Sequence, residues 1–279
     1  MNGKHVSEGV RMYRIVQEQD VQKLLKYYEQ DLKNCLYSYI DLKKFGISNP
    51  NLTVWLDDSD GIRCSALKYY EGLQLFDAEG KMDAAGTAEL IRTLNSHIVS
   101  STVEVIETLY PLLKDHYDME IGYVTEMRNL PEGEISEKVR PAEEKEYEEI
   151  AALICSDEGV GGHYEKEELK EQLLTRKKEG FGRNYILKHE GEIIHHAATY
   201  AELENLAVIS GVVTREDWRG KGVGTLAVRK LCYDLLKEGK KPCLFYYTKQ
   251  AAGFYKKIGF EEGTGWAKLV LRKEQPCTM

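Results

Sequence analysis

Hydrophobic and polar positions follow two periods along this chain, and the changes of period delimit the predicted elements. In the second half, the largely apolar run 206–213 is typical of a buried strand. Apolar residues then recur at the three- and four-residue spacing of a helix, from about Thr225 to a glycine cap at Gly239. The pattern therefore predicts a strand, a turn and a helix, with the turn formed by Arg219-Gly220-Lys221-Gly222-Val223-Gly224.

The remainder of the second half predicts further strands and helices around this unit. A polar turn bracketed by Pro131 and Gly133 precedes it and marks a domain boundary. Helices are predicted over 142–155 and 166–178, with a shorter one that ends at Gly259. Strands are predicted over 134–140, 184–189, 192–200, 243–248 and 266–271.

The first half gives a similar order of elements. Helices are predicted over 8–26, 31–43 and 84–108, and strands over 52–57, 61–70, 72–76 and 119–127. Helices, a three-strand meander, a helix and a strand thus occur in both halves. Either the halves share one fold, or the first is an unrelated α+β domain.

Composition narrows the classes of function. The 279 residues allow two domains, and 42% hydrophobic with 30% charged residues indicates a globular protein. A net charge of −8 disfavours nucleic-acid binding, which needs a basic face, and is compatible with a cationic amine substrate. Scattered cysteines without a C-x-x-C pair, and no long apolar run, predict a cytoplasmic protein without membrane association or a bound metal.

The glycine-rich turn fits one of three phosphate-binding patterns. A dinucleotide loop, G-x-G-x-x-G, fails because Thr225 stands at its third glycine, and no Gly-Lys-Ser/Thr of a P-loop occurs at the required spacing. The pattern [Q/R]-x-x-G-x-[G/A] is filled by Arg219, Gly222 and Gly224. Here the sequence resembles the GNAT superfamily of acyl-CoA-dependent N-acyltransferases, in which this loop holds the pyrophosphate of coenzyme A.

The residue types of the loop suit an anion. Glycines let the backbone approach phosphate oxygens, successive N–H groups form a concave anion site, and the following helix adds the positive end of its dipole. A flexible basic connector is the alternative. The residues expected to bind acetyl-CoA are Val212, Val213, Arg219, Gly220, Lys221, Gly222, Val223, Gly224, Thr225 and Tyr255.

A second motif follows the loop. Tyr255, Gly259 and Phe260 match the Y-x-x-x-G-F of the family's C-terminal helix, whereas Thr248 stands where the family often has Asn. The resemblance implies that Tyr255 is the catalytic acid that protonates the departing thiolate. A phenol of ordinary pKa, about 10, carries its proton at neutral pH and can donate it. The alternative role for Tyr255 is a core aromatic.

The resemblance also implies the fold and the domains. Residues 134–279 would form a complete GNAT acetyltransferase domain, with a mixed, mostly antiparallel sheet flanked by helices. Residues 1–129 would be a degenerate GNAT-like copy in a tandem arrangement, or the unrelated α+β domain. Glu79 and Asp83 stand where the first copy would need its phosphate loop, and their charges would repel a pyrophosphate.

The general base is the least defined part of the site. By resemblance, backbone groups around Gly211 polarise the thioester carbonyl, and the glycine itself marks a bulge. Glu202, just before this strand, is the residue we expect to act as the base. The other candidates are Glu204, His195, His196, Glu216, Asp217 and a chain of water molecules.

The resulting hypothesis is an enzyme that moves an acetyl group from acetyl-CoA to a primary amine of a small molecule. Two alternatives stay open: acetylation of a protein or peptide amine, and a non-catalytic CoA-binding sensor or interaction protein. The expected assembly is a monomer or a homodimer. The acceptor and the length of the acyl chain are left undefined.

Overall fold

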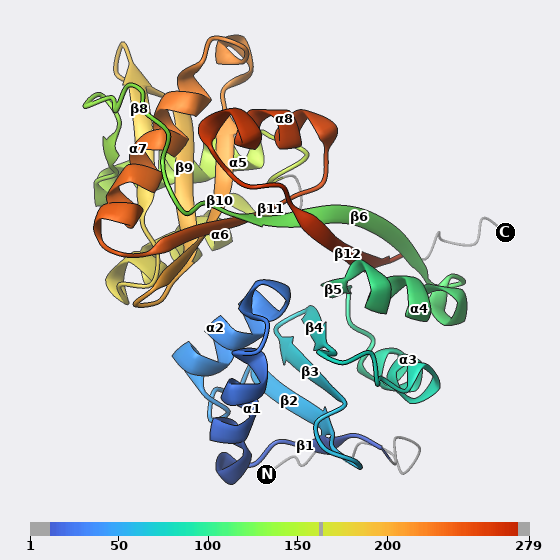
Figure 1. Cartoon of the computed structure of the whole chain (residues 1–279). Coiled ribbons are helices and arrows are strands. Elements are labelled where there is room, and N and C mark those ends of the chain that lie inside the picture. Colours follow the sequence, from blue (N-terminus) through green and yellow to red (C-terminus); the bar gives the residue numbers. More distant parts are fainter. Residues whose placement is uncertain (1–11, 162–163, 273–279) are drawn as a thin grey trace, which may run out of the picture. The chain divides into compact units, whose positions relative to one another are not determined.

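The computed structural model describes residues 12–161 and 164–272, and it divides the chain into two compact units (Figure 1). Unit 1 comprises Met1–Tyr123 and Thr264–Met279, and unit 2 comprises Val124–Gly263. Each unit is a sheet with helices on its faces. The predicted mixed α/β class is therefore confirmed.

Unit 1 has a sheet in the order β1-β2-β3-β4-β5-β12-β6. All of its assigned pairings are antiparallel except that of β4 with β5, which is parallel. The strands are β1 (Arg14–Ile15), β2 (Leu52–Asp57), β3 (Cys64–Tyr69), β4 (Gly72–Phe76), β5 (Ile98–Thr102), β12 (Thr264–Leu271) and β6 (Tyr117–Glu126), whose last residues belong to unit 2.

The helices of unit 1 are α1 (Val21–Tyr28), α2 (Leu36–Phe45), α3 (Ala84–Leu94) and α4 (Val103–Leu113). Leu90 of α3 and Leu109 of α4 are fully buried in a core cluster with strand residues such as Leu75. The ring of Tyr27 in α1 lies 5.1 Å from that of Phe76 in β4. Apolar side chains thus fix helices to the sheet, as the helical periodicity predicts.

Two predicted helices of unit 1 are wrong in part. Residues 8–11 of the helix expected over 8–26 lie outside the described residues, and the remainder is helical only from Glu18, where a 3-10 turn (Glu18–Asp20) follows the short strand β1 and leads into α1. The helix expected over 84–108 is interrupted by β5. Asn95 ends α3 in the left-handed conformation (φ 44°), and the β-branched residues that follow pair with β4 and β12.

Unit 2 has the strand order β11-β10-β9-β8-β7, with the end of β6 beside β11. Only β10 and β11 are parallel among its assigned pairings. The strands are β7 (Arg140–Pro141), β8 (Asn184–His189), β9 (Glu192–Glu202), β10 (Leu206–Thr214) and β11 (Lys241–Tyr246). The helices are α5 (Tyr147–Cys155), α6 (Lys166–Lys178), α7 (Val223–Lys237) and α8 (Lys249–Ile258). Of the strand predicted over 134–140, only its last residue is in β7.

The two faces of the unit 2 sheet carry separate cores. Leu231 of α7 and Ile258 of α8 are buried in one cluster, with strand residues such as Ile209. Ile150 of α5 and Leu173 of α6 are buried in another. Successive strand residues therefore face different helices, and adjacent residues of β9 can contact opposite sides of the sheet.

The order of elements is the same in both halves of the chain. The run β1-α1-α2-β2-β3-β4-α3-β5-α4-β6 corresponds to β7-α5-α6-β8-β9-β10-α7-β11-α8-β12, and in each half the parallel pair is joined by one helix. This repetition confirms the tandem hypothesis over an unrelated α+β domain. The last strand of the second repeat nevertheless pairs with β5, so the compact units differ from the predicted domains 1–129 and 134–279 at β12.

Within residues 12–161 and 164–272, every helix is too short or too polar to traverse a bilayer.

Replacing Gly259 by alanine should destabilise unit 2. Gly259 caps α8 with φ 116°, and a Cβ there would lie 2.3 Å from Cδ of Pro131. Gly239 after α7 has φ 79° and no atom within 4 Å of its added Cβ, so Gly239→Ala is the matched control. We expect Gly239→Ala to cost about 1–2 kcal/mol from backbone strain and Gly259→Ala about 2 kcal/mol more from the clash, measured by urea denaturation. Equal losses would contradict this.

Candidate active site

The predicted phosphate loop lies directly before α7. Gly222 is the N-cap of this helix (φ 81°), and Gly220 also has a positive φ (76°), a region in which other residues are strained. The helix begins at Val223, two residues earlier than expected. Gly224 and Thr225 therefore lie in the first turn, where the dipole is positive; the Thr225 N–H already donates to the Gly222 carbonyl at 3.1 Å, so the N–H groups before it are the ones that can bind an anion. This is the arrangement that binds phosphate.

The two cations of the loop have partners on the protein. Nη2 of Arg219 lies 3.0 Å from Oδ2 of Asp157, and its Nε donates to the Thr214 carbonyl at 3.2 Å. Nζ of Lys221 lies 4.7 Å from the ring centre of Trp218. Both cationic side chains are exposed. An anion at the loop would compete with the Asp157 carboxylate for Arg219.

The pairing between strands β10 and β11 ends before the chain reaches the loop. Their parallel pairing extends from Leu206 to Ile209 of β10 and no further. From Ser210 to Val213, the pairing of β10 with β9 shifts by one residue, which is a β-bulge, and Gly211 within it has φ 60°. The structure thus has the predicted bulge at Gly211. The predicted CoA-binding residue Val212 is half-buried here, and Val213 is buried.

Tyr255 lies on α8 in an aromatic group. Its ring centre is 5.0 Å from that of Phe254, 5.6 Å from that of Phe260 and 6.2 Å from that of Tyr246 in β11. Burial, and secondly Cys232, raise the pKa of Tyr255 to about 12, so the phenol carries its proton at neutral pH.

Thr248 fills the position in which the family often has Asn. Its hydroxyl caps α8 by accepting a hydrogen bond from the Ala251 N–H at 3.1 Å. A side-chain oxygen from Ser, Thr, Asn or Asp serves equally in this role. The difference from the family pattern is therefore compatible with the same helix.

Glu202 has the surroundings of a structural ion pair. Its carboxylate accepts hydrogen bonds from Arg183 Nε and Nη2, both at 2.7 Å, from Thr199 Oγ1 at 2.6 Å and from Lys240 Nζ. Burial alone would raise the pKa of Glu202, but these donors outweigh it and the pKa is lowered. A carboxylate so occupied is a poor proton acceptor.

The position of Glu202 also argues against the predicted role as base. Glu202 pairs with Ala207 of β10, whereas the thioester carbonyl is expected at Gly211, four residues along the strand and roughly 13 Å away at ~3.3 Å per residue. We therefore do not carry the base assignment further. The partners Arg183 and Lys240 are far from Glu202 in sequence, and no local pattern identified them.

The other candidate bases are equally unsuited. His195 and His196 are fully buried, and burial lowers the pKa of His195 to about 3 and that of His196 to about 4. The side chains of Glu204, Glu216 and Asp217 are exposed, and Arg215 lowers the pKa of Asp217. These five residues therefore supply no buried, basic proton acceptor.

The corresponding loop of unit 1, between β4 and α3, already holds an anion of its own. The Asp77 carboxylate accepts hydrogen bonds from the backbone N–H groups of Glu79 at 3.1 Å, Lys81 at 3.0 Å and Met82 at 2.9 Å. Asp83 then caps α3 through the Ala85 N–H. Carboxylates occupy the donors that a phosphate would need, which agrees with the predicted loss of the site in this copy.

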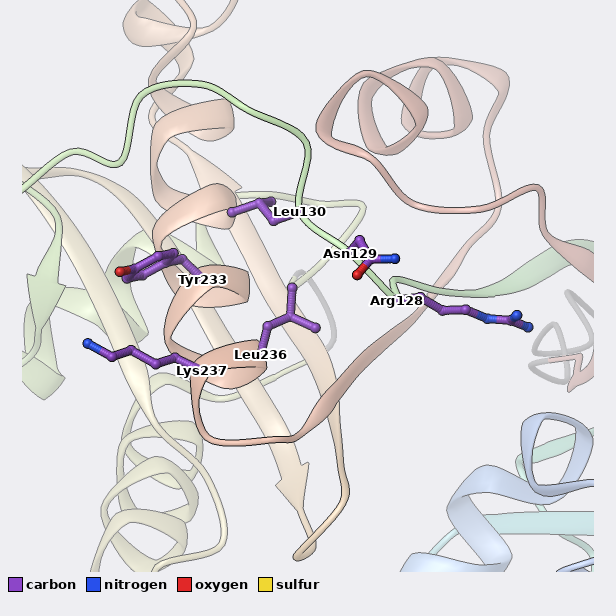
Figure 2. A pocket seen from close by; sticks show the side chains of 6 residues that line it. All are labelled: Arg128, Asn129, Leu130, Tyr233, Leu236 and Lys237. Atoms are coloured by element: carbon purple, nitrogen blue, oxygen red, sulfur yellow. The ribbon is translucent and has the colours of Figure 1, made fainter.

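A pocket of about 360 Å³ lies at the opposite end of α7 (Figure 2). It is lined by Arg128, Asn129 and Leu130, after β6, and by Tyr233, Leu236 and Lys237 of α7. Tyr233 follows Gly224 by nine residues, or roughly 14 Å along the helix axis at ~1.5 Å per residue. The pocket contains none of the predicted site residues, so the chemistry of the loop and bulge, not this cavity, defines the candidate site.

Among residues 12–161 and 164–272, no three His, Cys, Asp or Glu side chains are grouped so as to hold a metal ion.

Comparison with known proteins supports the resemblance. Residues 145–260 match the family model described as the acetyltransferase (GNAT) family. No curated protein sequence matches the chain.

Solved structures of similar fold cover nearly the whole chain. A GCN5-related N-acetyltransferase-like protein from Streptococcus suis 89/1591 is 15% identical, with 92% of this chain and all of that one aligned at a TM-score of 0.61. A GCN5-related N-acetyltransferase from Sphaerobacter thermophilus is 11% identical, with 92% and 94% aligned at a TM-score of 0.61. A tandem GNAT protein from the clavulanic acid biosynthesis pathway is 13% identical, with 94% and 99% aligned at a TM-score of 0.56.

At these identities the likeness is one of fold, and it extends over both repeats. The family model lies on the repeat that has the loop, the bulge and Tyr255. Residues 145–260 therefore match the model of the acetyltransferase (GNAT) family, and the fold of the chain is similar to that of a tandem GNAT protein.

Proposed function

We propose that the protein transfers an acetyl group from acetyl-CoA to a primary amine of a small molecule. The observation that carries this proposal is that β10, bulged at Gly211 and ending at Thr214, leads through a short 3-10 turn at Glu216–Trp218 to the loop at 220–225. Beyond Ile209 this strand is not paired with β11, so its backbone is free to pair with an extended ligand. A phosphate-binding turn follows directly.

The loop supplies the binding energy for the donor. First-turn N–H groups of α7, with Arg219 and Lys221, would hold the pyrophosphate. Because Arg219 is paired with Asp157 at 3.0 Å, the phosphate would have to exchange with that carboxylate. Both cations are exposed, so this exchange requires no buried charge to be uncovered.

The reaction itself makes one bond and breaks another. The amine nitrogen forms a bond to the thioester carbonyl carbon, the C–S bond breaks, and the sulfur leaves with its electron pair. A backbone N–H of β10 near Gly211 stabilises the negative charge on the carbonyl oxygen. Tyr255 donates its proton to the thiolate, and the ammonium formed on the substrate loses a proton to solvent water.

The net charge supports the proposed acceptor, and the cysteines support the proposed location. A protein with a net charge of −8 attracts cationic amines over a long range. All cysteines in the described part of the chain are free thiols, which supports a reducing, cytoplasmic environment. These cysteines are Cys35, Cys64, Cys155, Cys232 and Cys243. We also propose a monomer or homodimer.

The direct test is the release of free thiol from acetyl-CoA over a panel of small amines and of peptides, followed with a chromogenic thiol reagent. We expect turnover with small primary amines. Turnover with peptides alone would favour acetylation of proteins. Binding of CoA with no amine turned over would favour a sensor and overturn the proposal.

Tyr255→Phe should lower kcat about 100-fold, because the thiolate would leave without its acid. Since the pKa of Tyr255 is raised to about 12, its proton is lost only as pH rises through that value. The wild-type rate should therefore show no alkaline limb from this group between about pH 7 and pH 10. Tyr233→Phe, on α7 beside the remote pocket, is the control and should keep the wild-type rate. A fully active Tyr255→Phe variant would remove the acid role.

Glu202→Gln should affect stability and leave the acidic limb of the kcat/KM profile unchanged. Losing a buried partner of Arg183 and Lys240 should cost about 3 kcal/mol of unfolding free energy at pH 7. The pKa of Glu202 is lowered on folding, so its contribution is present above the unfolded value of about 4.3 and is lost as pH falls below it. The difference between variant and wild type should vanish in acid. A displaced acidic limb would reinstate Glu202 as the base.

A further inference from the structure

The stretch of β10 from Ser210 to Thr214 is paired on one side only, with β9, and the bulge interrupts that pairing at Gly211 and Val212. Pairing with β11 ends at Ile209. A strand left open on one side and bulged on the other has few backbone hydrogen bonds to fix it. Its geometry then depends on other contacts.

Two adjacent histidines of β9 provide those contacts. His195 Nδ1 lies 2.7 Å from Thr214 Oγ1, and His196 Nδ1 lies 2.7 Å from the carbonyl oxygen of Gly211. Both rings are fully buried. Because neighbouring residues of a strand point to opposite faces, the two rings hold β10 from the two sides of the sheet.

The His196 ring is one member of a buried hydrogen-bonded chain. Its Nε2 lies 2.9 Å from Oδ1 of Asn184 in β8, and Nδ2 of the same side chain lies 3.2 Å from the hydroxyl of Tyr147 in α5. Asn184 and Tyr147 are buried as well. The chain therefore links α5, β8 and β9 to the bulge of β10.

The direction of the protons follows from the chemistry of the groups. Burial lowers the pKa of His196 to about 4, so the ring is neutral and has one N–H. A carbonyl can only accept, so that hydrogen is on Nδ1 and points to Gly211. Nε2 must then accept, so we assign the Asn184 amide the orientation turned by 180° from that in the structure, with its NH₂ facing the ring and its oxygen facing the Tyr147 hydroxyl. In that orientation, every donor of this hydrogen-bonded chain points toward the bulge, and the hydrogen bonds strengthen one another.

Fixing the Gly211 carbonyl also fixes the next N–H. In a planar trans peptide the C=O of one residue and the N–H of the following one point in opposite directions. The Val212 N–H is therefore directed away from the His196 ring and not toward β9. Gly211 is needed for this turn of the backbone, since its φ is 60° and a Cβ would lie 3.2 Å from Cε1 of His196.

Unit 1 has no such arrangement at the corresponding place. Strands β3 and β4 pair in unbroken register, without a bulge. The pairing runs from Ser65 opposite Phe76 to Tyr69 opposite Gly72. The bulge and its histidine thus occur in the repeat whose loop is open to a phosphate, and not in the repeat whose loop is filled by Asp77. Their joint occurrence links the histidine to the reaction and not to the fold common to both repeats.

We propose that His196 is a positioning residue for acyl transfer, which holds the Gly211 carbonyl so that the Val212 N–H is aimed at the thioester carbonyl oxygen. This inference rests on the proposed acetyl transfer. His196 itself contacts neither substrate, and its effect is exerted through the one peptide unit between Gly211 and Val212.

Three substitutions separate positioning from simple packing. The amide nitrogen of His196→Asn can replace Nδ1 and keep the bond to Gly211, His196→Gln places its amide toward Asn184 instead, and His196→Leu keeps volume without a donor. We expect His196→Leu to lose roughly 100-fold in kcat with an unchanged Kd for CoA, and His196→Asn to retain most of the rate. A wild-type rate in His196→Leu, or equal losses in the Leu and Asn variants, would overturn the inference.

Two further measurements keep the inference testable whatever happens to turnover or folding. The ¹⁵N shifts of His196 in the wild-type protein should show the proton on Nδ1, and a proton on Nε2 would refute the inference. An acetyl-CoA analogue with a methylene in place of sulfur should bind roughly five-fold tighter than CoA to wild type, and the Leu variant should lose that preference. If wild type binds neither ligand, the proposed function fails, whereas an unchanged preference in the variant refutes only the role of His196.

Discussion

The end of the parallel pairing at Ile209 is the constraint on which the rest of the site depends. A strand that leaves its neighbour gains free backbone groups but loses the hydrogen bonds that would hold it straight. In unit 2 the loss is compensated by side chains: His195 and His196 bind β10 on its paired side, and the apolar cores on both faces pack against it. The five residues from Ser210 to Thr214 are thereby both open to a ligand and held in place.

The two repeats share one topology but differ in whether the loop before the helix is open or is already filled by carboxylates of the protein. In unit 2, glycines before α7 leave the helix N-terminus open to solvent, and the loop's cations can turn to an incoming anion. In unit 1, Asp77 accepts three backbone N–H groups of the equivalent loop. The carboxylate stabilises that turn in the same way as a bound phosphate would, and so makes the loop independent of any ligand.

Local sequence patterns predicted the elements and motifs whose signals are contiguous. The loop at 219–225, the helix of Tyr255 and most element boundaries of the second half agree with the structure. The strand β5 was missed because its few residues, Ile98–Thr102, lie between two helices whose periodicity runs on across them. The setting of Glu202 was missed for another reason: Arg183 and Lys240 meet it only through the sheet. Likewise, adjacency of His195 and His196 was visible, but the contact of His196 with Gly211 depends on a bulge that shifts the register.

The position of β12 has a consequence for folding during synthesis on the ribosome. Unit 1 contains residues from the start of the chain, yet its sheet includes Thr264–Leu271 beside β5. Synthesis proceeds from the N-terminus, so the repeat made first waits for a strand made near the end, while the contiguous residues Val124–Gly263 can collapse earlier. Until then, the edge of β5 in the first repeat is exposed and can pair with other nascent chains. Translation speed through the second repeat therefore sets how long that edge stays uncovered.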